Sequence, residues 1–336
     1  MKSRLGALAL PLLMLAVGIR APIGYAQDGP NNREATVTIT ENGNYAVVAG
    51  PILTAAFDRA MQELEGFSPQ ITPDQAREAS FRRRLLELRL LMDLYAYAYH
   101  SDRLSTFRDL VDDAYERTGI YQDIPVVSKL LGASFPPDLV TGRQLNMNIQ
   151  LAALRDPSIR SATRAFLGSP TGSIGQLEPD DVPRIWEIAG QTPHNGLDSV
   201  GNAAMLGASA LAGVQASNPF VADVFDPVQE AHFHDVRKTI RSALLLMMMF
   251  PETRQAIQAN EISEPMFELV SQYGDVNDAF VAHRIAPRLG ADAGKAAQDL
   301  RDEFEKAQKR QGVVVEQRTF DALINALNAV AQRHQQ

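Results

Sequence analysis

Apolar positions along this chain recur every three to four residues over long stretches, the spacing that places side chains on one face of an α-helix. Proline, serine and glycine separate these stretches and set their expected ends. The pattern predicts helices over residues 51–67, 73–100, 103–117, 227–250, 264–284, 292–311 and 316–334. The expected fold class is therefore all-α.

Two parts of the chain depart from the helical period. Within residues 27–50, Thr36–Thr40 and Tyr45–Ala49 flank Asn42-Gly43, which predicts a short N-terminal β-hairpin because Asn-Gly supplies the positive φ angles of a tight turn. Residues 132–225 are interrupted by Pro, Gly and Ser clusters, with small residues from Gly201 to Gly213. We predict an irregular middle insertion there, made of short helices and long loops.

Two helical stretches resemble each other when the chain is shifted by 154 residues. They share a proline, a basic pair, an apolar tail and a Gly-x-x-x-Asp pattern in the same order. This shift matches Pro73 with Pro227, Arg83 with Arg237 and Arg84 with Lys238. One residue of insertion then matches Gly119 with Gly274 and Asp123 with Asp278. This predicts a duplicated unit, with two pseudo-symmetric helical-bundle halves at residues 51–131 and 226–336.

One helix carries a row of cations. At i, i+3, i+4 and i+7, the side chains of His234, Arg237, Lys238 and Arg241 share one helix face. The same line continues through Leu245 and Met248, so the helix becomes apolar nearly all round and must be buried there. The row is therefore expected at the mouth of a cleft that attracts anions. The competing interpretation is a solvated helix face whose cations pair with acids.

Residues 1–26 are expected to be a cleavable signal peptide. Lys2 and Arg4 precede an apolar run from Leu5 to Ile19, and small residues stand before a predicted cleavage site at Gln27. A lone membrane anchor is the alternative, but the run is short for a span and contains Pro11. The mature protein is therefore expected in the periplasm or secreted, with no membrane span.

Charge and composition exclude several classes of function. The full chain of 336 residues has a net charge of -8, and loss of three basic residues with the signal peptide moves the charge to -11. Such an acidic protein is a poor nucleic-acid binder. Without cysteine there is no thiolate chemistry. His232 and His234 point apart on a helix, so we expect neither a metal site nor a cofactor, and no catalytic motif is present.

The motif His234-x-x-Arg237-Lys238-x-x-Arg241, followed by Leu244-Leu245 and later by the segment Leu269–Asp278, resembles the CHAD family, the conserved histidine α-helical domain. Members have two pseudo-symmetric helical-bundle halves around a basic cavity and are associated with inorganic polyphosphate. The resemblance implies that His234, Arg237, Lys238 and Arg241 line such a cavity, with Arg83 and Arg84 opposite. It also implies a structural turn at Gly119 and Asp123, and another at Gly274 and Asp278.

Several positions depart from the family pattern. Ser80 stands where the first half should carry its histidine, and Glu87 stands where a cation is expected. Ser242 and Leu244 occupy positions that are often basic in the family. The resemblance covers residues 51–131 and 227–334 and is specific only in the second half.

Three functions follow as expectations. The first is binding of polyphosphate or another polyanion without catalysis. The second is a structural or protein-interaction scaffold of the cell envelope that keeps the fold but has lost the ligand. The third is an enzyme acting on phosphorylated substrates, with His234 as acid or base.

Overall fold

The computed structural model describes residues 45–99, 102–170, 198–258 and 263–335. Within these residues the chain forms 12 α-helices and no β-strand, which confirms the all-α class. The expected signal peptide and the first strand of the expected hairpin lie outside the described residues. Tyr45–Ala49 is helical, so the second strand of the hairpin is wrong. Val48 and Ala49 are buried against the core, and this packing outweighs the local preference of the segment.

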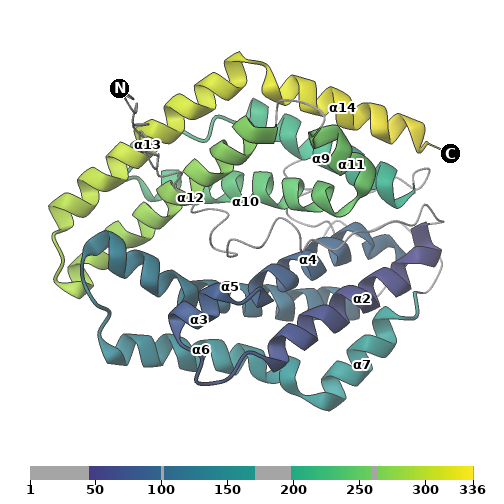
Figure 1. Ribbon diagram of the computed structural model, residues 1–336, viewed down its shortest axis with the longest axis horizontal. Helices are drawn as coiled ribbons and strands as arrows, with labels where there is room; N and C mark the ends of the chain where they lie inside the picture. The colour runs from purple at the N-terminus through teal and green to yellow at the C-terminus, as the bar shows by residue number, and fades with distance from the viewer. Residues whose placement is uncertain (1–44, 100–101, 171–197, 259–262, 336) are drawn as a thin grey trace, which may run out of the picture.

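The described helices fall into two groups that follow each other along the chain (Figure 1). The first group is α2 (Tyr45–Glu65), α3 (Pro73–Glu78), α4 (Phe81–Leu94), α5 (Asp102–Leu131), α6 (Pro137–Arg155) and α7 (Pro157–Leu167). The second group is α9 (Ser199–Ala216), α10 (Pro227–Met249), α11 (Pro251–Gln258), α12 (Ser263–Ile285), α13 (Ala293–Glu316) and α14 (Thr319–Arg333). Each group also contains one 3₁₀-helix, η1 (Ala96–Ala98) between α4 and α5 and η3 (Ala286–Leu289) between α12 and α13. We call the groups the first and the second half.

Helix starts follow the capping chemistry of the sequence. Thr72 and Gln75 form a capping box at the start of α3, with Pro73 in the first turn. Asp226 accepts a hydrogen bond from the backbone N–H of Val228 and so begins α10, the helix that carries the predicted cationic row. The position of this row is therefore fixed by a local signal.

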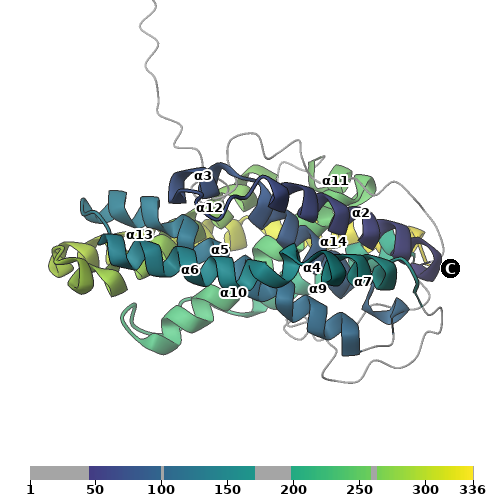
Figure 2. The same ribbon diagram turned by 90° about the horizontal axis from the view of Figure 1, so that it is seen from below.

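Each half is a bundle with long helices inside and a helix pair at its outer edge. In the first half α4 packs on α2 and α5, and α6 and α7 form the edge. In the second half α10 packs on α9 and α12, and α13 and α14 form the edge. Figure 2, seen from below, shows α6 and α7 on the outside of the first half. The two halves meet where α5 packs on α12 and α4 packs on α10.

The hydrophobic core crosses the boundary between the halves. Two clusters of buried side chains fill the molecule, and the larger one is made mainly of first-half residues. It also contains Val200 from α9 and Leu246, Met249 and Phe250 from the end of α10. The C-terminal part of α10 is thus buried, as its apolar sequence predicts.

The middle of the chain is more regular than predicted. Its described residues form α6, α7 and α9, of 19, 11 and 18 residues. The first two pack on the first half and the third packs on the second, so they do not form a separate insertion. Pro137 starts α6 where proline suggested a loop, because the first helical turn needs no N–H donor from it. The rest of the expected loop region, residues 171–197, lies outside the described residues.

Candidate functional site

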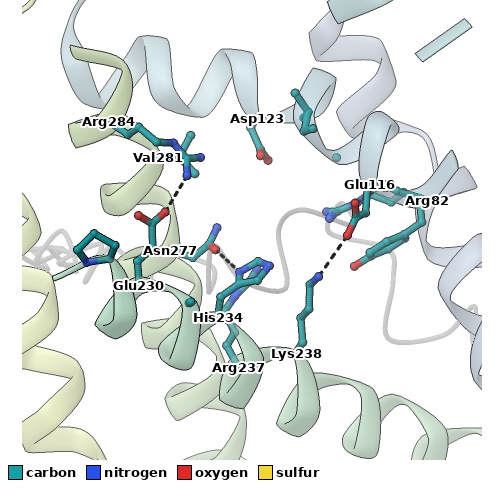
Figure 3. Close-up of a pocket in the computed structure, with 15 residues that line it drawn as sticks. Arg82, Glu116, Asp123, Glu230, His234, Arg237, Lys238, Asn277, Val281 and Arg284 are labelled. Atoms are coloured by element: carbon teal, nitrogen blue, oxygen red, sulfur yellow. Dashed lines mark hydrogen bonds and ion pairs between the residues drawn. The ribbon is translucent and has the colours of Figure 1, made fainter. Parts of the chain in front are cut away.

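A cavity of about 430 Å³ lies between the halves, where α4 and α5 face α10 and α12 (Figure 3). Its lining contains four permanent cations, three carboxylates and one histidine. Such a volume is typical of a site for a small molecule or for the end of a longer one. The charged lining is Arg82, Glu116, Asp123, Glu230, His234, Arg237, Lys238 and Arg284.

Three of the four residues in the predicted row reach this cavity. His234, Arg237 and Lys238 line it from α10. Arg241, one turn further on, instead donates a hydrogen bond to the hydroxyl oxygen of Tyr115 at 3.2 Å. The predicted row therefore supplies part of the lining and one residue that fixes the opposite wall.

Arg237 is the most deeply placed cation of the cavity, with a side chain only 5% exposed. Burial lowers its pKa to about 10, the neighbouring Arg241 adds to this, and the nearby Asp278 opposes it. At neutral pH the guanidinium is still charged. A buried charge of this kind attracts an anion more strongly than an exposed one, because water screens it less.

Two ion pairs lie in the cavity lining, one between the halves and one within the second half. The Lys238 ammonium lies 3.4 Å from a carboxylate oxygen of Glu116, and the Arg284 guanidinium lies 2.9 Å from one of Glu230. Lys238 and Glu116 are 36% and 50% exposed, so their pairing contributes little to stability, typically 1 kcal/mol or less. These cations are therefore held in place weakly enough to exchange a carboxylate partner for a ligand.

Arg82 forms the wall of the cavity on the first half. Its guanidinium lies 4.3 Å from the centre of the Tyr115 ring, and its Nε donates to the Tyr115 carbonyl oxygen at 3.4 Å. It also lies against Gly119, where a Cβ atom would stand 2.6 Å from its Nη2 atom. Gly119 is thus not a turn, as expected, but a position in the middle of α5 that leaves room for Arg82.

Arg83 and Arg84 do not line the cavity. Arg83 is buried and lies 3.0 Å from Glu87, and Arg84 lies 2.8 Å from the second oxygen of the same carboxylate. Glu87 itself is 1% exposed. The two arginines thus belong to an internal ion cluster on α4, and the expectation that they face the ligand is wrong. Arg82, their neighbour in sequence, has that place.

His234 is held by Asn277 of α12, with 3.0 Å between Nδ1 of the ring and Oδ1 of the amide. Burial, together with the charges of Lys238 and Arg237, lowers its pKa to about 4. His234 is therefore neutral in the free protein near neutral pH. The sequence places His234 in a row of cations, and the structure corrects this, because its ring carries no charge at neutral pH.

The other three residues expected in structural turns also lie inside helices. Asp123 is in α5, and Gly274 and Asp278 are in α12. Packing of α5 and α12 against each other outweighs the cost of about 1 kcal/mol for glycine inside a helix. Burial raises the pKa of both carboxyls, that of Asp278 to about 7. The negative charge of Asp123 contributes to the raised pKa of Asp278, so the two acids interact across the boundary between the halves.

The cavity-lining residues of α5 and α12, whose place in the site the sequence analysis does not predict, have a recognisable spacing. On α5 the lining residues are Glu116, Gly119, Ile120 and Asp123, at i, i+3, i+4 and i+7. On α12 they are Asn277, Val281 and Arg284, again on one helix face. The sequence predicts that the helix ends before Gly119, so it does not place Ile120 and Asp123 on the same helix face as Glu116. Tyr115 directly precedes the α5 row in the sequence. Its ring lies under the Arg82 guanidinium, and its hydroxyl oxygen accepts a hydrogen bond from Arg241.

A second cavity, of about 270 Å³, lies on the other side of α12 and is acidic. Asp278 borders it together with acids of α12 and α13, and Lys306 is the only cation in its lining. In the described part of the chain no group of three or more His, Cys, Asp or Glu side chains is arranged to hold a metal ion. The basic cavity and the acidic one are thus separated by a single helix.

Comparisons with protein-family models, with curated proteins and with solved structures find no match to this chain. None of the described helices combines the length and the apolar character needed to cross a membrane. The cavity and its charges therefore stand as the basis for a functional assignment.

Proposed function

We propose that this protein is an exported, non-enzymatic binding protein that holds inorganic polyphosphate or another polyanion in the cavity between its halves. The observation that carries this proposal is the convergence of Arg82, Arg237, Lys238 and Arg284 from three helices on one cavity. Phosphate oxygens accept charge-assisted hydrogen bonds from such groups, each contributing about 1.5–3 kcal/mol. Export is proposed from residues 1–26 alone.

The energetics of the two ion pairs support binding. Lys238 and Arg284 are exposed enough that parting them from Glu116 and Glu230 costs about 1 kcal/mol each or less. A phosphate group that replaces the carboxylate forms contacts of at least equal strength. The freed carboxylates are 50% and 34% exposed and regain water. A polyanion can therefore enter without a large penalty.

The arrangement of helices supports the CHAD-like duplication as part of the proposal. The packing of α4 on α2 and of α5 on α6 in the first half has a counterpart in α10 on α9 and α12 on α13 in the second. The edge helices α7 and α14 likewise pack on α2 and α9. The proposed pseudo-twofold relation between the halves would account for this repeat.

A scaffold function is the second candidate, because one observation favours it. The first-half basic pair, Arg83 and Arg84, is neutralised by Glu87, and carboxylates also reduce the positive charge of the cavity. Such a protein keeps the fold, binds no polyanion and acts through a protein partner of the cell envelope. Polyphosphate binding decides between the two.

The test is titration of the whole protein with polyphosphate at about 20 mM and about 150 mM salt, since screening weakens contacts between exposed charges. A Lys238→Gln, Arg284→Gln variant removes two cavity cations. A Lys295→Gln, Lys309→Gln variant makes the same change of charge on the exposed side of α13. Circular dichroism verifies the folding of both.

We expect salt-sensitive binding that the cavity variant weakens at least about tenfold, corresponding to about 1.4 kcal/mol or more, while the α13 variant stays within about threefold. Absence of binding by the unmodified protein at low salt would contradict the proposal and leave the scaffold. Equal weakening in both variants would show that net charge, and not the cavity, attracts the ligand.

A further inference from the structure

Asp123 is a carboxyl group in the middle of a basic site. Figure 3 shows it pointing into the cavity from α5, opposite His234. The two ion pairs of the cavity lining belong to Glu116 and Glu230, so Asp123 takes part in neither. An anion that reaches Arg237 therefore also meets this carboxyl.

The charged groups around Asp123 come from every neighbouring helix. Burial has the largest effect on its pKa and raises it above the ordinary value, although the surrounding cations lower it. The second titratable neighbour in the cavity, His234, is neutral. The surrounding groups are Arg77 of α3, Arg82 of α4, Arg143 of α6, Arg237 of α10 and Asp278 of α12.

A carboxylate and an oxyanion repel each other at this depth unless a proton lies between them. With the proton they form an O–H···O⁻ hydrogen bond, which is among the stronger ones in proteins. The proton comes from the ligand when the ligand has an ionisable hydroxyl, as a terminal or monoester phosphate does, with a second pKa of about 6. Sulfate and the phosphates inside a chain carry no such proton near neutral pH.

We infer that Asp123 selects the ligand by its proton: the cavity accepts a terminal or monoester phosphate group, which shares one proton with Asp123, in preference to mid-chain phosphates and sulfate. This inference rests on the proposed function and narrows its ligand class. The volume of about 430 Å³ agrees with it, since a cavity of this size takes the end of a phosphate chain and not a long stretch of it. Arg237 and Arg82 neutralise the remaining charge of the end group.

The test compares linear tripolyphosphate with cyclic trimetaphosphate, which has the same number of phosphorus atoms but no chain end. Both are titrated into the full chain by calorimetry at pH 6.5, as are phosphate and sulfate. We expect at least about tenfold preference for the linear compound, a difference of about 1.4 kcal/mol. In Asp123→Asn the preference falls to less than about threefold, because the amide shares no proton with the ligand but still donates to any anion.

The matched control is Asp58→Asn. This residue lies on the surface of α2, away from the cavity, and pairs with Arg164 at 2.8 Å. The substitution changes the net charge by the same amount, so it corrects for the different charges of the two ligands. We expect it to keep the preference of the unmodified protein.

A second readout needs no variant. Binding measured near pH 8 in two buffers of different ionisation enthalpy reports the protons taken up with the ligand. We expect uptake of up to one proton with tripolyphosphate and none with sulfate. This readout keeps the inference testable if Asp123→Asn does not fold.

The outcomes separate the two proposals. If no phosphate compound binds the unmodified protein, the proposed function fails and this inference fails with it. If tripolyphosphate and trimetaphosphate bind equally well, or if Asp123→Asn keeps the preference, only the selection by Asp123 is overturned.

Discussion

The guanidinium group of Arg82 lies against the backbone of Gly119, so close that a Cβ atom at position 119 would stand 2.6 Å from Nη2. This contact joins α4 to the middle of α5 and holds the guanidinium over the Tyr115 ring. One missing side chain thus determines where a cavity cation lies.

Gly119→Ala is expected to move Arg82 out of the cavity wall. Because the end of an arginine side chain is flexible, the free energy of unfolding should change by less than about 1 kcal/mol, while polyphosphate affinity falls at least about fivefold. Denaturant unfolding and titration measure the two quantities. Gly142→Ala in α6 is the control, since a Cβ there meets nothing within 4 Å and should stabilise the protein by about 1 kcal/mol. Unchanged affinity in Gly119→Ala would contradict the role of Arg82.

Glu87→Gln tests whether Arg83 and Arg84 are structural. The substitution removes the negative charge that pairs with Arg83 and Arg84. Because these buried arginines then lack a carboxylate partner, the free energy of unfolding should fall by about 3 kcal/mol. Urea unfolding measures this loss. Ligand affinity, measured below the unfolding transition, should stay within about threefold. A large loss of affinity in a stable variant would place these arginines in the site after all.

Asp278 should make the protein less stable as pH rises. Burial, together with Asp123, raises its pKa from 3.8 to about 7, so the folded state binds more protons than the unfolded state between these values. The free energy of unfolding therefore falls as pH increases from about 4 to 7. Asp278→Asn removes this fall, and denaturant curves at several pH values measure it. An unchanged pH slope in the variant would show that Asp278 is not the titrating group.

His234 should have the opposite effect on stability. Burial and its cationic neighbours lower its pKa from 6.5 to about 4, so the folded state binds fewer protons than the unfolded state in this window. The free energy of unfolding rises with pH from about 4 to 6.5 on its account. In His234→Gln this rise disappears. The free energy of unfolding of the variant, relative to that of the unmodified protein, should therefore be higher at pH 5 than at pH 7.5. NMR titration of the ring gives an independent value.

His334 ties the C-terminal helix to two other elements. Its Nδ1 lies 2.7 Å from Asp198 at the start of α9, and its Nε2 lies 3.0 Å from Glu252 in α11. Burial lowers its pKa, but the hydrogen bonds to Glu252 and Asp198 outweigh burial and raise the pKa above the ordinary value. The stabilisation is therefore complete below about pH 6.5 and is lost as pH rises through the folded-state pKa.

His334→Gln should cost about 1–2 kcal/mol at pH 6 and less at pH 9. Thermal or denaturant unfolding at the two pH values measures this difference, and His232→Gln, at a partly exposed ring on α10, is the control. A cost that does not change with pH would mean that the imidazole is neutral in the folded protein.

The all-α class and three members of the cationic row could be predicted because both depend on helical spacing alone. His234 and Lys238 share a face in any helix of this sequence, and the apolar residues after Arg241 fix which end is buried. The spacing also marks α12, where Asn277 and Arg284 follow the same rule.

The choice among Arg82, Arg83 and Arg84 could not be made from the sequence. Consecutive residues point in directions about 100° apart on a helix, so the cation that faces the cavity depends on how α4 is rotated against α5. Gly119 leaves room for Arg82, and the buried Glu87 pairs with Arg83. Neither contact can be predicted before the packing of the helices is known. The role of Gly119 cannot be predicted for the same reason, since a glycine can end a helix or leave room for a neighbouring side chain.

The shared core has a consequence for the unity of the chain. Leu246, Met249 and Phe250 from the second half belong to the larger core cluster, which is made mainly of first-half residues, so the halves share part of their interior. Cleavage between α7 and α9 would give two fragments, each with an exposed apolar surface that the other fragment covers. Each fragment should aggregate alone and stay in solution as a pair. In folding terms the protein should behave as one cooperative unit, with a single unfolding transition in spite of its two bundles.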